Sequence, residues 1–207
     1  MIKQYNYTMK KLLLIVLLVV ATIGVHGQKK TILLDVSHEI DTAYTYVNPD
    51  IFEQYKDLVE NKIGANLIIN KDKEINDAML CKTDVLIVLS PLKRDRDTPK
   101  NNLTSVEREA IVSYVKDGGK LIFFMDEEDR VDMESFGGND ILKPFGMEYG
   151  MDLPMIPDVG ATSLITEVSK NEYELSYSGS RALTGGTPLS LRNGEGEHVH
   201  GAYVKLD

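Results

Sequence analysis

The sequence has very little cysteine and fewer basic than acidic residues, and both features restrict what the protein can be. Cys81 is the only cysteine among 207 residues, so the chain forms no internal disulfide and depends on a hydrophobic core. Lysine and arginine number 23 against 32 aspartates and glutamates, which gives a formal net charge of −9. A nucleic-acid-binding surface needs a basic stripe, so neither nucleic acid nor an anionic membrane surface is expected as a partner.

Long apolar runs are also scarce, and the one present lies at the amino end. Residues 12–20 are all apolar, three lysines precede them, and the small residue Gly27 follows soon after. This arrangement is typical of a secretory signal peptide, whereas an uncleaved anchor would need a run of about 20 apolar residues. We therefore assign residues 1–27 to a signal peptide and expect a periplasmic or extracellular protein with no membrane attachment after cleavage. Loss of the three lysines would change the net charge from −9 to −12.

Four short apolar runs predict buried strands at residues 31–36, 65–69, 84–89 and 120–125. Between them, residues 48–63 and 104–117 place apolar side chains at helical spacing, and residues 75–79 form a shorter helical segment. Strands that alternate with helices over short connections indicate a parallel sheet covered by right-handed crossovers. The predicted fold class is α/β, a doubly wound and mostly parallel sheet flanked by helices, as in flavodoxin-like proteins.

One helix has clear local signals at both ends. Thr104 and Glu107 form the sequence pattern of a capping box, and Gly118 and Gly119 provide a stop. An earlier helix is expected to begin at Asn48 and to end at Gly64. These signals place the helix boundaries more firmly than the apolar spacing alone.

The pattern weakens beyond Asp126. Glycines interrupt a loop-rich stretch, and strands are predicted at residues 174–178, 188–191 and 199–205. We expect residues 28–207 to form a single domain with a loop-rich or β-rich C-terminal extension. The sequence stops in or just after the last predicted strand, so we also expect the domain to be truncated at its carboxyl end.

The sequences DVLIVLSP (residues 84–91) and LTSVEREAIVSYVKDGGKLIFFMD (residues 103–126) suggest a family. They resemble the class I glutamine amidotransferase-like domains of gliding-motility and intraflagellar-transport proteins. They are also similar to an exported Bacteroidetes family of unknown function with the same fold, which is sometimes associated with polysaccharide breakdown. The resemblance implies an amidotransferase-like α/β domain in the cell envelope.

The sequence departs from that family at the position of the nucleophile. A working glutamine amidotransferase carries its cysteine on a sharp turn after a strand, with flanking glycines and a downstream histidine and acid. The corresponding strand end here reads Phe124, Met125, Asp126, Glu127 and Glu128. Cys81 instead lies near a short helix, where a small packing residue is expected. We therefore expect no amidotransferase chemistry and no cofactor.

Three loops follow predicted strands and would meet at one edge of the sheet, where open α/β proteins bind their ligands. The predicted cleft consists of Ser37, His38, Glu39, Ser90, Arg94, Asp126 and Glu127. The alternative is that these residues are polar because loops contact solvent.

Two further groups of residues are candidate metal sites. Asp126, Glu128, Asp129 and Asp132 carry the oxygen ligands that calcium prefers, although their spacing is not that of an EF-hand and a solvated acidic turn explains them as well.

His198 and His200 flank Val199 on a predicted strand and so share one face, close to Glu195 and Glu197. Zinc would need a third ligand, which no residue supplies at a suitable spacing, so an exposed polar strand is the expected alternative.

The leading functional hypothesis is an exported non-catalytic module. It would bind a small molecule, a glycan or a protein partner of the cell envelope through the predicted cleft. The alternative is a hydrolase acting on a carbohydrate or ester, with His38 as general base and Glu39 or Asp126 assisting. A third hypothesis, a structural part of an envelope assembly, predicts an exposed apolar patch instead of a cleft.

Overall fold

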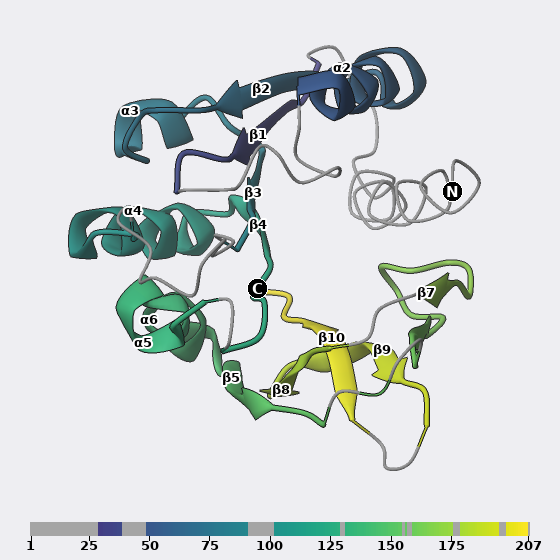
Figure 1. Ribbon diagram of the computed structural model, residues 1–207. Coiled ribbons are helices and arrows are strands. Elements are labelled where there is room, and N and C mark those ends of the chain that lie inside the picture. Colours follow the sequence, from purple (N-terminus) through teal and green to yellow (C-terminus); the bar gives the residue numbers. More distant parts are fainter. Residues whose placement is uncertain are drawn as a thin grey trace. The chain divides into compact units, whose positions relative to one another are not determined.

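The computed structural model describes residues 29–38, 49–90, 102–128, 131–154, 156, 159–175, 179–194 and 198–206. The predicted signal peptide and the predicted helix cap at Asn48 lie outside these residues. The chain divides into two compact units: a first unit around residues 28–149 and a second unit around residues 150–204 (Figure 1). Over the described ranges, no helix is long and apolar enough to cross a membrane. That residues 28–207 fold as one domain stays a prediction.

The first unit contains a four-stranded parallel sheet with the order β2-β1-β3-β4. Its strands are β1 (Thr31–Asp35), β2 (Asn66–Asn70), β3 (Val85–Val88) and β4 (Lys120–Phe123). Leu33 of β1 lies beside Ile68 of β2 and Leu86 of β3, and Leu86 lies beside Leu121 of β4. The predicted α/β class with a parallel sheet is confirmed, and the strand order is compatible with a flavodoxin-like fold.

Helices alternate with these strands. They are α2 (Pro49–Asp57), continued by the π-helical turn η1 (Leu58–Ile63), α3 (Asp77–Leu80), α4 (Ser105–Lys116), α5 (Met133–Phe136), α6 (Gly138–Leu142) and the 3-10 turn η2 (Lys143–Phe145). The predicted stop at Gly64 is confirmed, since this residue has φ 77°, a left-handed conformation that suits glycine. The predicted capping box is confirmed as well: Thr104 and Glu107 bond each other's backbone N–H groups at the start of α4.

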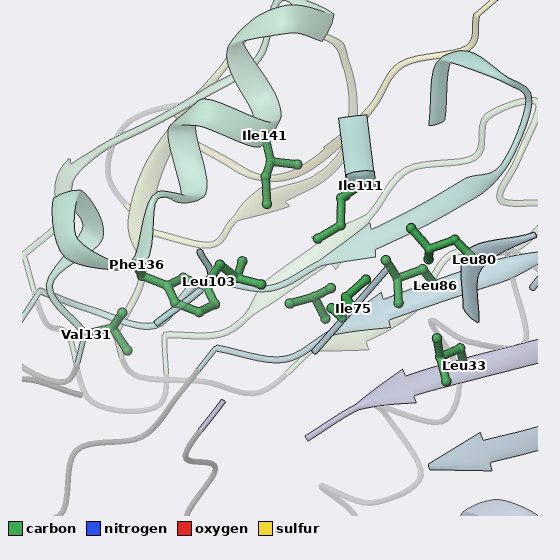
Figure 2. Close-up of a cluster of buried hydrophobic side chains, with 10 residues drawn as sticks. Leu33, Ile75, Leu80, Leu86, Leu103, Ile111, Val131, Phe136 and Ile141 are labelled. Carbon is green, nitrogen blue, oxygen red and sulfur yellow. The ribbon is translucent and has the colours of Figure 1, made fainter. Parts of the chain in front are cut away.

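The core of the first unit explains why its apolar runs were visible in the sequence. Figure 2 shows a cluster of buried side chains from β1, β3, α3, α4, the residues just before α3 and α4, and the segments that follow β4. Its members are Leu33, Ile75, Leu80, Leu86, Val88, Leu103, Ile111, Val131, Phe136 and Ile141. Every residue of β1 after Thr31 and every residue of β3 is buried. Successive strand side chains point to opposite faces, so both faces of these two strands are covered.

The second unit contains a four-stranded antiparallel sheet. A sheet with the order β10-β9-β6-β7 contains β6 (Ala161–Ser163), β7 (Glu174–Leu175), β9 (Thr187–Arg192) and β10 (Val199–Tyr203). A separate pair is formed by β5 (Glu148–Asp152) and β8 (Arg181–Thr184). The strands predicted near residues 174, 188 and 199 correspond to β7, β9 and β10.

Candidate functional site

Asp35 is a fully buried carboxylate at the carboxyl end of β1. The parallel register places Asn70, the last residue of β2, directly beside it. Its Oδ1 accepts hydrogen bonds from Ser37 Oγ and from Asn70 Nδ2, each at 2.7 Å. A buried carboxylate is stable only with such hydrogen-bond partners. The carboxyl end of β1 is therefore a hydrogen-bonded polar cluster inside an otherwise apolar region.

His38 lies between two carboxylates. Its Nδ1 is 2.6 Å from Asp35 Oδ2, and its Nε2 is 3.2 Å from Glu107 Oε1. The residue is 2% exposed, and its ring and the ring of Phe136 form a T-shaped pair with centroids 6.4 Å apart. Both ring nitrogens therefore face an acceptor oxygen inside the protein.

Glu107 supplies the second carboxylate from the first turn of α4 and is also buried. Its Oε2 accepts from the backbone N–H and the hydroxyl of Thr104, at 2.8 and 3.0 Å. Its Oε1 accepts from the backbone N–H of Ile75 at 2.9 Å, in addition to the contact with His38. One side chain thus joins the start of α4, the segment before α3 and the loop after β1. We call Asp35, His38 and Glu107, with Ser37 and Asn70, the His38 network.

The two carboxylates determine the charge of His38. Burial alone would lower the pKa of its imidazole, but the hydrogen bond and charge of Asp35, followed by the charge and hydrogen bond of Glu107, raise this pKa above the ordinary value of 6.5. The hydrogen-bond geometry agrees, because two carboxylates can both accept only from a ring that is protonated on both nitrogens. His38 is therefore favoured as an imidazolium in the folded protein.

This geometry does not suit acid–base catalysis. A general base needs a ring nitrogen with a lone pair directed at the substrate, whereas both nitrogens of His38 are directed at carboxylates. Ser37 does not complete a catalytic triad either. Its Oγ lies 3.2 Å from His38 Nδ1, the nitrogen that Asp35 contacts, whereas in a triad serine and aspartate contact opposite nitrogens.

The other described residues of the predicted cleft lie after β3 and β4. Ser90 is buried, and its Oγ accepts a hydrogen bond from the backbone N–H of Asp126 at 3.0 Å. Asp126 Oδ1 accepts from the backbone N–H of Glu127, a residue that is also buried. The parallel register places these residues at the same edge of the sheet as the His38 network. Glu39 and Arg94 lie outside the described residues, and ligand binding at this edge stays a prediction.

The weak metal candidates are not gathered into a site among the described residues. Asp132 caps α5, where its Oδ1 accepts from the backbone N–H of Ser135 at 2.6 Å. Asp126 bonds the backbone as stated above, and Asp129 lies outside the described part of the chain. In that part, no group of three or more histidine, cysteine, aspartate or glutamate side chains is placed to hold a metal ion. Glu128 therefore belongs to no such group.

His198, just before β10, and His200, within β10, have different surroundings. His198 is exposed, as the polar-strand interpretation expects. His200 is half-buried, and its Nδ1 lies 3.1 Å from Ser190 Oγ. Burial, followed by the charge of Arg192, lowers the pKa of His200 to about 4. Glu195 and Glu197 lie outside the described residues.

Sequence reasoning missed three members of the His38 network: Asp35, Asn70 and Glu107. Asp35 and Asn70 are polar residues at the ends of two apolar runs, a signal that could have marked them as a pair at one sheet edge. Glu107 was recognised only as half of a capping box, and its contact with a histidine 69 positions earlier leaves no local trace.

No family model matches this sequence, and no curated protein matches it. The resemblance to amidotransferase-like domains, the export of the chain and its glycan or protein partners therefore stay predictions.

Proposed function

We propose that this chain is an exported, non-catalytic binding module with a doubly wound, amidotransferase-like fold. Its ligand, a neutral glycan or another small polyhydroxy molecule of the cell envelope, would bind at the carboxyl edge of the parallel sheet. The order β2-β1-β3-β4 supports this position. Successive strands lie on one side of β1 and then on the other, and open α/β sheets bind ligands where this reversal occurs.

The observation that carries the proposal is that both ring nitrogens of His38 contact carboxylates. A hydrolase would need this imidazole as a base, with Glu39 or Asp126 assisting. Its contacts are with Asp35 and Glu107 instead, at 2.6 and 3.2 Å, and the ring is almost completely buried. Binding therefore agrees with the geometry better than hydrolysis does.

The same contacts would give the edge a fixed shape. The His38 network holds the residues after β1 against β2 and α4, and the bond from Asp126 to Ser90 holds the residues after β4 against β3. Hydroxyl and carboxylate groups on a rigid support suit a ligand with many hydroxyl groups. The net charge of −9 disfavours anionic polysaccharides at an acidic edge.

The proposal includes two finer features of the fold: the doubly wound arrangement of the helices and the C-terminal extension. The connection through α2 joins β1 to β2 in one direction, and that through α4 joins β3 to β4 in the other. Right-handed crossovers in opposite directions would place these helices on opposite faces, as in a doubly wound sheet. The β-rich second unit would then be the C-terminal extension of this fold.

A thermal-shift screen of the purified protein against neutral mono- and oligosaccharides, uronates and divalent cations tests the proposal. We expect a neutral saccharide to raise the Tm, because a ligand that binds only the folded state stabilises it. Asp126→Asn should reduce that shift. Asp117→Asn should not, since it makes the same charge change at an exposed residue at the far end of α4. Absence of any saccharide shift, or release of hydrolysis products from a saccharide or ester, would contradict the proposal.

A further inference from the structure

The turn that follows β9 contains a reactive dipeptide. Asn193 and Gly194 form the only Asn-Gly pair among the 207 residues. In any asparagine, the side-chain carbonyl carbon lies within reach of the backbone nitrogen of the next residue, and a bond between them closes a five-membered ring. Glycine has no Cβ to obstruct this close approach, so an Asn-Gly pair closes the ring more readily than asparagine before a larger residue.

The backbone of this turn requires the glycine. Gly194 has φ 102°, a conformation that residues with a Cβ rarely adopt. The residue is exposed, so solvent is at hand to accept the proton that the attacking nitrogen must lose. Asn193 is half-buried, and its backbone N–H donates to Gly160 O at 3.1 Å. The pair is thus part of a defined turn, and a larger residue at position 194 would strain that turn.

The side-chain amide of Asn193 is held by its oxygen. Its Oδ1 accepts a hydrogen bond from the hydroxyl of Thr162 in β6 at 2.8 Å. Its Nδ2 lies near Gly160 and makes no hydrogen bond to any described residue. Attack on the carbonyl carbon moves negative charge onto the oxygen and expels the nitrogen. The donor therefore lies where charge develops, and the leaving group is not retained.

We propose that Asn193 is a site of spontaneous deamidation and that the hydroxyl of Thr162 assists the reaction. The Gly194 nitrogen, having lost its proton to water or hydroxide, forms a bond to Asn193 Cγ, and the carbonyl electron pair moves onto Oδ1. This pair returns as the Cγ–Nδ2 bond breaks, and Nδ2 takes up a proton and leaves as ammonia. Water then opens the succinimide at either carbonyl, which gives aspartate or isoaspartate. Nothing is oxidised or reduced, and water is the only co-reactant.

The product places a second carboxylate beside one hydroxyl group. Thr162 Oγ1 also lies 3.3 Å from Glu174 Oε1, and Thr162 pairs with Glu174 where β6 meets β7. A hydroxyl has a single hydrogen, so a carboxylate at position 193 competes with Glu174 for it and repels the glutamate. Because β7 has only two residues, deamidation would loosen it from β6. This reaction lies in the second unit and does not depend on the proposed function.

Incubation of the purified full chain at mildly alkaline pH, followed by digestion with trypsin and mass spectrometry, tests the site. The tryptic fragments 193–205 and 171–181 each contain one asparagine and no glutamine. Asn171 is the matched control, because it is exposed but precedes Glu172, which carries a Cβ. We expect the mass gain of an amide-to-acid conversion, with isoaspartate, to appear at Asn193 at least about tenfold faster than at Asn171. Digestion in water enriched in heavy oxygen marks any conversion that follows cleavage.

Two variants test the part played by Thr162. Thr162→Val keeps the branched shape and removes the hydroxyl, so it should slow the conversion of Asn193 by up to about tenfold, the effect of losing one hydrogen bond. Thr187→Val makes the same change at an exposed position of β9 and should leave the rate unchanged. An equal rate at Asn193 and Asn171 in the unaltered protein, or an unchanged rate in folded Thr162→Val, would overturn the proposal.

The consequence for β7 has its own readout. Asn193→Asp reproduces the charge of the product and should speed hydrogen exchange at the backbone N–H of Ser163, which donates to Tyr173 O at 2.9 Å just before β7. Addition of Glu174→Gln to that variant should restore slow exchange, because it removes the opposing charge. Unchanged exchange at Ser163 in Asn193→Asp would contradict the predicted loosening of β7. The deamidation measurement on the unaltered protein stands even if a variant does not fold.

Discussion

Replacing Glu107 with glutamine preserves the size of the side chain and removes its charge. The native carboxylate accepts from Thr104 through Oε2 and from Ile75 through Oε1, which also faces His38. A glutamine amide has one acceptor oxygen. Whichever way the amide is turned, its NH₂ group faces one of these donors, so a buried N–H loses its acceptor.

The magnitude follows from these contacts. Removing one partner of a buried ion pair costs about 3 to 5 kcal/mol, because the remaining charge is left without compensation. Asp35 still pairs with His38 in the variant, so we expect the lower part of that range. Glu109→Gln is the matched control, since it changes the same charge at an exposed position two residues further along α4 and should cost less than about 0.5 kcal/mol.

The assay has to report on the first unit alone, because the chain contains two compact units. Amide hydrogen exchange in β1 and β3 under increasing urea provides this, since both strands lie in the buried core of the first unit. We expect the exchange free energies of these amides to fall together in Glu107→Gln. If Glu107→Gln cost no more than Glu109→Gln, Glu107 would not be the link between α4 and the His38 network.

Three further predictions can be checked with the same assay. Thr104→Ala removes one half of the capping box and should lower the free energy of unfolding by about 1 kcal/mol. An unchanged free energy of unfolding would show that the capping box does not stabilise α4. Gly119→Ala would place a Cβ 2.3 Å from the ring of Tyr114. At Gly64 a Cβ would meet no atom within 4 Å, and Gly64→Ala should cost only the backbone strain at φ 77°, about 1 to 2 kcal/mol. Gly119→Ala should therefore lower the free energy of unfolding more than Gly64→Ala. For His38 the pKa is raised on folding, so its protonation stabilises the protein fully below 6.5, and this contribution is lost as pH rises through the folded-state pKa. The free-energy difference between wild type and His38→Gln should shrink over that window, and a difference that grows with pH would contradict the assignment.

The sequence was informative where the determinants are local or periodic. β3 is buried on both faces and reads as an unbroken apolar stretch, whereas the run that became β1 is mostly apolar and contains the buried Asp35. The capping box of α4 depends on two residues three positions apart. Each of these patterns has its physical cause within a few residues, so the parallel sheet, the start of α4 at Thr104 and the helix stop at Gly64 could be predicted, whereas α5 and α6 were not.

The His38 network could not be predicted in the same way. Asn70 reaches Asp35 only because β1 and β2 pair in one particular register, and Glu107 reaches His38 only because α4 packs near the end of β1. The sequence did mark His38 as a polar residue after a strand, but its partners determine whether it is a base or a charged structural residue.

The central claim is that His38 is an imidazolium held between Asp35 and Glu107, which excludes it as a general base. Side-chain ¹⁵N NMR of His38 across neutral pH tests this most directly. We expect both ring nitrogens to carry a proton, with a titration midpoint above the ordinary value of 6.5. A ring with one bare nitrogen and a midpoint at or below 6.5 would contradict the claim and would restore the hydrolase hypothesis.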